Sequence, residues 1–168
     1  MSENKSKTIK IICDQRECAS EVNKDLENLS TEEITVEVTL EQLSVGDYLL
    51  ADDIVIERKA IADLETSIMD GRIFNQLAEL QKIPRSGLIV EGELSKLFSD
   101  KARIQKSALI GLITSIGLNY RIPIFFTKNQ KETAEFLYTI AKKEQLGNGS
   151  SVSKLRYSKT KMNFSDRQ

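Results

Sequence analysis

Short apolar segments along the chain have the spacing of β-strands. Residues 9–13 form a largely apolar run, and residues 34–40 alternate apolar and polar side chains with the period of two that a half-buried strand requires. Two apolar triplets, 48–50 and 54–56, flank a short polar turn and predict a tight β-hairpin. The remaining predicted strands are residues 87–90 and 122–126.

Between these strands, apolar residues recur with helical spacing. Ser20 and Asn129 are candidate N-caps of the first and last helices, and Asp70-Gly71 separates two helices in the middle of the chain. The predicted apolar faces consist of Val22, Leu26 and Leu29; Ile61, Leu64 and Ile68; Phe74, Leu77 and Leu80; the stretch 104–118; and Phe136, Leu137 and Ile140. Strands separated by helices predict an α/β domain with a mixed central sheet.

The length of 168 residues fits one domain with short extensions. We expect a flexible N-terminus over residues 1–7, a folded domain over 8–146 and a flexible basic tail over 147–168. From Asn148 onward there are five basic residues and one acidic residue, a net charge of +4. Because the whole chain carries −1, residues 1–147 carry −5. The tail is therefore expected to attract phosphates without reading sequence.

The composition excludes several kinds of chemistry. There is no histidine, so Ser-His-Asp catalysis and imidazole metal ligands are excluded. Two cysteines, Cys13 and Cys18, cannot form a four-ligand zinc site, and we expect both to be reduced structural thiols of a cytoplasmic protein, nucleoid-associated or nuclear according to the cell. No apolar run approaches the ~20 residues of a membrane span. An enzyme built from this sequence must use carboxylates, lysine, arginine or a hard metal ion.

The predicted hairpin gathers charged residues on one face. If Asp52 lies at its centre, three residues face three others across it: Leu50 faces Ile54, Tyr48 faces Ile56, and Asp47 faces Glu57. Lys59, two residues beyond Glu57, shares that face. Opposed carboxylates repel each other unless a cation or a shared proton relieves the repulsion, and Mg²⁺ prefers carboxylate oxygens.

The alternative interpretation is a solvated hairpin whose charged residues only cover its outer face. Two features favour a site. Gly46 precedes Asp47 at a strand start, where glycine permits close approach of another group. A second acidic pair, Asp14 and Glu17, follows the first strand and is expected to face the same place.

An ordered series of short motifs gives the chain a family resemblance. The series is Gly46-Asp47-Tyr48, Glu57-Arg58-Lys59, Asp63-Leu64, Ser67-Ile68 and Asp70-Gly71-Arg72, preceded by Asp14-Gln15-Arg16-Glu17. Over about residues 8–145 the chain resembles the nuclease domain of the XPF family of structure-selective endonucleases, including its archaeal members. The resemblance implies a restriction-endonuclease-like fold and Mg²⁺- or Mn²⁺-dependent cleavage of branched DNA, typically 3′-flaps and forks, in repair or fork processing.

The resemblance also implies roles for individual residues. The implied metal ligands are four carboxylates, Asp14, Glu17, Asp47 and Glu57, together with the main-chain carbonyl of Arg58. Lys59 is the implied catalytic lysine and Asp63 orients the groups around it. The implied DNA contacts are Arg16, Arg72 and Gln76; Arg72 and Gln76 share a helical face, and the alternative for Arg72 is a salt bridge with Asp70 or Asp63.

The resemblance extends to partners. Family members dimerise through the part of the fold that contains the apolar stretch 104–118, so we expect a homodimer unless that stretch is simply core. We expect these 168 residues to lack the tandem helix-hairpin-helix domain that usually follows in the family. Met162-Asn163-Phe164 is too short a motif to establish a sliding-clamp or repair partner. The alternatives to a nuclease of this type are a non-catalytic DNA-binding or scaffold subunit and a junction-resolving nuclease of related fold.

Overall fold

Six strands form one mixed sheet in the computed structural model, which describes residues 6–17 and 20–147. The strand order is β2-β1-β3-β4-β5-β6. β1 pairs in parallel with β2, β3 runs antiparallel to both β1 and β4, and β4, β5 and β6 are parallel to one another. The strands are β1 (Lys7–Asp14), β2 (Ile34–Glu41), β3 (Tyr48–Ala51), β4 (Ile54–Ala60), β5 (Arg85–Glu91) and β6 (Ile124–Thr127).

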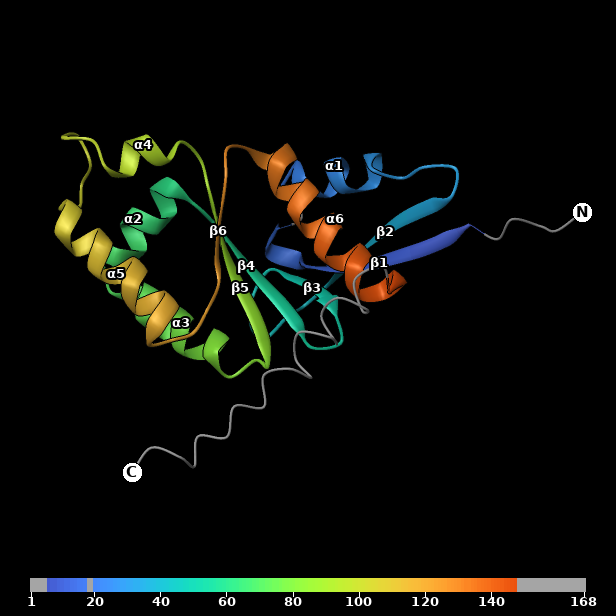
Figure 1. Cartoon of the computed structure of the whole chain (residues 1–168), viewed down its shortest axis with the longest axis horizontal. Coiled ribbons are helices and arrows are strands. Elements are labelled where there is room, and N and C mark those ends of the chain that lie inside the picture. Colours follow the sequence, from blue (N-terminus) through green and yellow to red (C-terminus); the bar gives the residue numbers. More distant parts are fainter. Residues whose placement is uncertain (1–5, 18–19, 148–168) are drawn as a thin grey trace, which may run out of the picture.

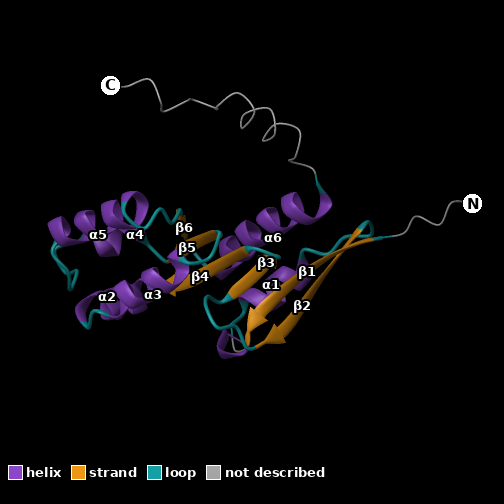
Figure 2. Ribbon diagram, turned by 90° about the horizontal axis from the view of Figure 1, so that it is seen from below, coloured by secondary structure: helices purple, strands orange, loops and turns teal. Residues whose placement is uncertain are grey.

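Helices cover both faces of this sheet. The helices are η1 (Gln15–Glu17), α1 (Val22–Asn28), α2 (Ile61–Met69), α3 (Arg72–Gln81), α4 (Leu94–Leu97), α5 (Lys106–Leu118) and α6 (Gln130–Leu146). α1 and α6 lie on one side of the sheet, while α2 to α5 lie on the other (Figure 1). Figure 2 shows the same arrangement from below, with β1 and β2 extending beyond the helices.

The sheet divides the apolar interior into two cores. Because side chains alternate along a strand, β4 contributes to both of them. Ile54 and Ile56 pack in the core beneath α1 and α6, whereas Val55 packs in the core beneath α2 to α5. The residues that follow on β4 continue this alternation, so Glu57 and Lys59 point toward the α3 side, and Arg58 points toward the α6 side.

The structure confirms the α/β domain with a mixed sheet, and it confirms the hairpin pairing of Tyr48 with Ile56. The predicted pairing of Leu50 with Ile54 is wrong. A register shift between Leu49 and Ala51 places Ala51 opposite Ile54. An irregularity of this kind inserts an extra residue on one strand. The alternation of apolar and polar residues in the sequence gives no signal of it.

The buried face of α3 also differs from the predicted one. Phe74 was expected in the core with Leu77 and Leu80, but its side chain is 48% exposed and Ile73 is buried in its place. Residues 73 and 74 are adjacent, and the helical period alone accommodates either of them on a face with 77 and 80. The short helix α4 was not predicted, and the last strand begins two residues later than expected.

Gly46 makes the close approach that its position suggested. Its φ is +76°, and a Cβ atom built on it would lie 2.2 Å from Cγ1 of Val55. That distance is far inside van der Waals contact, and the positive φ disfavours any side chain. Glycine therefore lets the chain before β3 press against β4 and sets the position of Asp47.

Some expectations fall on residues that the structure does not describe. These are Cys18, the segment 162–164, and most of the expected termini 1–7 and 147–168. Cys13 is a buried free thiol whose sulfur accepts a hydrogen bond from Asn23 at 3.4 Å. Within the described ranges, none of the helices combines the length and apolar character needed to cross a bilayer.

Candidate active site

A cleft of about 320 Å³ opens where the chain before β3, strand β4 and helix α3 meet. Asp47 and Glu57 both line this cleft, as the hairpin pattern predicted. Its walls also include Arg16 from η1 together with Asn75 and Gln76 from α3. The cleft therefore combines two carboxylates with the cationic and amide groups suited to a phosphate backbone.

Main-chain hydrogen bonds hold Asp47 in place. Its amide donates to the carbonyl of Ile56 at 2.9 Å, and its own carbonyl accepts from the amide of Asp14 at 2.8 Å. The side-chain oxygen Oδ2 accepts from the amide of Arg58 at 2.8 Å. Asp47 is thus tied to β1 and β4 at once, and one carboxylate oxygen is fixed against the backbone between Glu57 and Lys59.

The two carboxylates of the cleft destabilise each other's charge. Burial, reinforced by the neighbouring charge of Glu57, raises the pKa of Asp47 to about 7. Burial also raises the pKa of Glu57, although the Lys59 ammonium opposes that effect. Lys59 Nζ lies 3.9 Å from Glu57 Oε1, so it compensates the negative charge only in part. A cation in the cleft would relieve this repulsion.

The donor set suits a hard divalent cation. Among residues 6–17 and 20–147, no three acidic or cysteine side chains converge on one point as a preformed metal cluster. Mg²⁺, however, is commonly held by one or two carboxylates and completes its coordination with waters and substrate phosphates. Asp47, Glu57 and an adjacent main-chain carbonyl meet that requirement.

Asp14 and Arg16 form a separate pair at the edge of the cleft. Asp14 Oδ2 accepts from Nε of Arg16 at 2.6 Å and from its amide at 3.1 Å, while Oδ1 accepts from the amide of Leu43 at 2.8 Å. The hydrogen bond from Arg16 lowers the pKa of Asp14. The Asp14 carboxylate is therefore ionised, and both of its oxygens accept hydrogen bonds. The Arg16 side chain itself is largely exposed beside the cleft.

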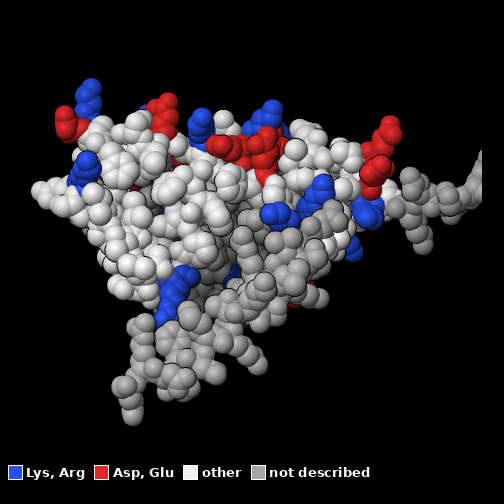
Figure 3. Space-filling view, in the orientation of Figure 1, with Lys and Arg blue, Asp and Glu red and all other residues white. Residues whose placement is uncertain are grey.

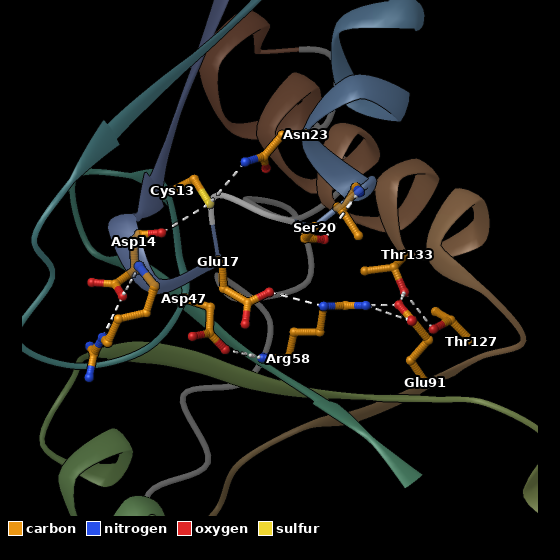
Figure 4. A network of polar contacts seen from close by, with 12 residues as sticks. Cys13, Asp14, Glu17, Ser20, Asn23, Asp47, Arg58, Glu91, Thr127 and Thr133 are labelled. Atoms are coloured by element: carbon orange, nitrogen blue, oxygen red, sulfur yellow. Dashed lines mark hydrogen bonds and ion pairs between the residues drawn. The ribbon is translucent and has the colours of Figure 1, made fainter. Parts of the chain in front are cut away.

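Glu17 and Arg58 meet on the other face of the sheet. Nη1 of Arg58 donates to Oε2 of Glu17 at 2.9 Å, and two further donors of the same guanidinium bind Glu91 at 2.9 and 2.7 Å (Figure 4). The predicted site residues thus divide between two places. Asp47 and Glu57 line the cleft, with the Lys59 ammonium beside Glu57. The Glu17 carboxylate pairs with the Arg58 guanidinium, although its charge still helps to raise the pKa of both cleft carboxylates.

The remaining predicted residues lie on α2 and α3. Gln76 lines the cleft, and its Oε1 is buried without a hydrogen-bond partner in the described part of the chain. Arg72 begins α3 and forms a salt bridge with Asp70 at 2.7 Å, which was the alternative expected for it. Asp63 is exposed in the first turn of α2 and does not line the cleft.

Two residues next to the site were not found from the sequence. Glu91, at the end of β5, binds Arg58, and Thr133 of α6 donates to Oε2 of Glu91 at 2.6 Å. Burial raises the pKa of Glu91, but the hydrogen bonds from Arg58 and Thr133 outweigh burial and lower it. Glu91 directly follows the apolar run 88–90, whereas Thr133 stands among polar residues near the start of α6, so no local pattern marks the two as partners.

Comparison with known proteins assigns the family. The chain matches the family model described as the ERCC4 domain over residues 13–140, which is most of its length. The chain belongs to the ERCC4-domain family. This ERCC4 domain is 36% identical over 146 residues to the 3′-flap repair endonuclease Xpf of Saccharolobus solfataricus, covering 85% of the chain and 59% of that protein.

A second relative is a protein of Methanocaldococcus jannaschii that carries the name of an ATP-dependent RNA helicase. It is 43% identical over 162 residues, which cover 96% of the ERCC4-domain chain and 19% of the relative. The chain thus spans less than two thirds of these curated relatives.

Solved structures agree with the family. The XPF protein of Aeropyrum pernix, in a structure titled as a complex with DNA, matches with a TM-score of 0.73 and 31% identity, covering 86% of this chain and 69% of that one. The expected resemblance to the XPF family and the restriction-endonuclease-like fold are both confirmed.

Proposed function

We propose that this ERCC4 domain is a metal-dependent, structure-selective DNA endonuclease that cuts branched DNA, such as 3′-flaps and forks, during repair or fork processing. The observation that carries the proposal is the pair of carboxylates, Asp47 and Glu57, whose charges repel each other in a cleft beside Lys59. The names of its relatives, a 3′-flap repair endonuclease and an XPF protein in complex with DNA, support the substrate class. Such an enzyme would act at chromosomal DNA.

In this proposal Asp47, Glu57 and the main-chain carbonyl of Arg58 hold Mg²⁺ or Mn²⁺. The bound ion would lower the pKa of a water molecule and neutralise charge on the phosphate. Asp14 and Glu17 each form a salt bridge with an arginine. Either carboxylate could join the ligand set only by leaving that arginine and binding the ion instead. The core ligands are therefore the two cleft carboxylates.

The chain's own residues would position the scissile phosphate. The nearly buried Lys59 ammonium would stabilise the negative charge that develops on the phosphate as a water oxygen bonds to phosphorus. One ester bond to phosphorus breaks in the same displacement, and the leaving oxygen takes up a proton. Arg16 and Gln76 line the cleft, where the guanidinium and the side-chain amide would donate to the DNA backbone.

Arg72 and Asp63 belong to the outer part of the proposed DNA path. Arg72 lies at the N-terminus of α3, where free backbone amides and a guanidinium favour a phosphate once Asp70 is displaced. Asp63 would help to orient the neighbouring site residues rather than touch the reacting atoms, since it does not line the cleft.

We also propose that the domain forms a homodimer through α5 and β6. Ile110 and Leu118 of α5 and Phe126 of β6 are 49%, 73% and 40% exposed. The surface over α5 and β6 is largely uncharged, and the charged side chains in this view lie mainly along the upper margin and over α6 (Figure 3). An exposed apolar surface of this kind is typical of an interface.

The test of the nuclease is cleavage of an end-labelled 3′-flap in Mg²⁺ and in Mn²⁺. We expect Asp47→Ala to lower the rate at least about 100-fold, because the ligand set loses a carboxylate. The matched control is Asp52→Ala, which removes an exposed acid from the turn of the same hairpin and should cleave like the wild type. Intact flaps with wild-type protein in both metals would refute the proposal.

The alternatives predict other outcomes in the same assay. A non-catalytic DNA-binding or scaffold subunit would bind flaps and cut none. A junction-resolving nuclease would cut intact four-way junctions in preference to flaps. The complete cleft of Asp47, Glu57 and Lys59 favours an active nuclease over the first alternative.

A further inference from the structure

The side chain of Arg58 is held behind the cleft, on the side of the sheet that faces α6. Its guanidinium makes one hydrogen bond to Glu17 and two to Glu91, at distances of 2.7 to 2.9 Å. Only 13% of the side chain is exposed. Each of the three guanidinium nitrogens thus donates to a carboxylate on this side of the sheet.

Glu91 is in turn held by a chain of hydroxyl groups. The Thr133 hydroxyl, on α6, donates to Oε2 of Glu91 at 2.6 Å and lies 2.7 Å from the hydroxyl of Thr127 on β6. Because a hydroxyl carries one hydrogen, Thr127 donates to Thr133. Both threonines are essentially buried. The network therefore runs from β6 and α6 through Glu91 to β4.

The main chain of Arg58 connects this network to the cleft. Its amide donates to Oδ2 of Asp47 at 2.8 Å, and its two sequence neighbours are Glu57 and Lys59. The guanidinium on one face of β4 and the amide that holds Asp47 belong to the same residue. Figure 4 shows both ends of this connection, the guanidinium between Glu17 and Glu91 and the amide beside Asp47. A guanidinium without its carboxylate partners would leave the backbone that carries the cleft residues less firmly held.

We propose that Glu91, supported by Thr133, is a positioning residue that fixes the geometry of the Asp47–Glu57 cleft through Arg58. This inference rests on the proposed nuclease function. Neither residue touches the substrate. Their effect is to keep two carboxylates and Lys59 within reach of one ion and one phosphate. The exact positions of these side chains depend on the network, whereas the fold of the domain does not.

The test uses the full chain with two substitutions, Thr133→Val and Glu91→Gln. Thr133→Val keeps the shape of the side chain and removes only the hydroxyl. We expect Mn²⁺ binding without DNA, followed by electron paramagnetic resonance, to weaken about 10-fold or more, and kcat on the 3′-flap to fall about 10–100-fold with KM for DNA unchanged. The matched controls are Thr139→Val and Glu135→Gln, on exposed positions of α6.

The possible outcomes separate positioning from other roles. If Thr133→Val lowers only the melting temperature and leaves Mn²⁺ binding and kcat intact, the residue is merely structural and the proposal is overturned. If KM rises while kcat holds, the network serves DNA binding and the proposal is again overturned. If Glu91→Gln does not fold, the result for Thr133→Val alone decides between a positioning role and a structural one. If wild-type protein cleaves nothing, the nuclease proposal fails, while Mn²⁺ binding by the variants still tests positioning.

Discussion

At the scale of single residues, Asp47 carries an unfavourable charge. Its pKa in the folded protein is about 7 because burial and the charge of Glu57 disfavour the carboxylate, whereas the ordinary value is 3.8. A raised pKa in the folded state means that the stabilising contribution is present below pH 3.8 and is lost as the pH rises to about 7. The metal-free protein is therefore destabilised by Asp47 at neutral pH.

Asp47→Asn should raise the melting temperature of the metal-free protein at pH 8, because asparagine cannot ionise. Each pKa unit corresponds to about 1.4 kcal/mol, so the gain in the free energy of unfolding is at most about 4 kcal/mol. The gain should shrink toward pH 4, where the wild-type carboxyl is protonated. Thermal melts from pH 4 to pH 8, with Asp52→Asn as the control, measure it. An equal gain at both ends of that range would contradict the charge argument.

At the scale of elements, the start of α6 matters to both stability and the site. Asn129 Oδ1 accepts from the amide of Glu132 at 2.9 Å, and the Glu132 side chain accepts in return from the amide of Lys128. This reciprocal cap satisfies the Glu132 amide, which the first turn leaves open, and the Lys128 amide just before the helix. Thr133 lies one residue beyond Glu132, so the cap also anchors the hydroxyl that holds Glu91.

Asn129→Ala should lower the free energy of unfolding by about 1 kcal/mol, because the helix loses its N-cap acceptor. Urea denaturation measures the change as a lower midpoint at constant slope. Gln130→Ala, at the first position of the same helix, is the control and should leave the midpoint within a few tenths of a kcal/mol of the wild-type value. A midpoint equal to that of the wild type in Asn129→Ala would show that the cap is dispensable.

Elements that depend on a local pattern of residues could be predicted from the sequence. The hairpin that brings Asp47 to Glu57 follows from alternation and one short turn, and the cap at Asn129 follows from residue type. In the structure, the alternation of side chains along β4 places Arg58 on the face opposite Glu57. Its partner Glu91 could not be predicted, because β4 and β5 are joined through two helices and the register of parallel strands has no local signature.

At the scale of the whole molecule, the uncharged surface and the cleft lie at different places on the α2-to-α5 side of the sheet. The uncharged surface over α5 and β6 lies beyond the α2-to-α5 core, whereas the cleft opens beside α3. A stable interface buries about 800 Å² from each partner, which requires more than one helix face. The edge strand β6, through the exposed side chain of Phe126, adds to the apolar surface of α5.

Ile110→Lys should convert the proposed dimer into a monomer, because it places an unpaired charge at the centre of the apolar surface. Light scattering coupled to size-exclusion chromatography, over a range of micromolar concentrations, measures the mass. The control is Leu40→Lys, a substitution of the same kind at an exposed apolar residue of β2, on the opposite edge of the sheet. A monomeric wild type at the highest concentration would end the dimer proposal.

The division of Glu57, Arg58 and Lys59 between two sides of β4 bears on the design of inhibitors. A compound that fills the cleft meets the Asp47 and Glu57 carboxylates, with the nearly buried Lys59 ammonium beside Glu57, while the Arg58 guanidinium lies on the other face of the sheet. An anionic arm added to capture that arginine would have nothing to bind. A metal-chelating head that bridges Asp47 and Glu57, with an amide group for Gln76, matches the chemistry that the cleft presents.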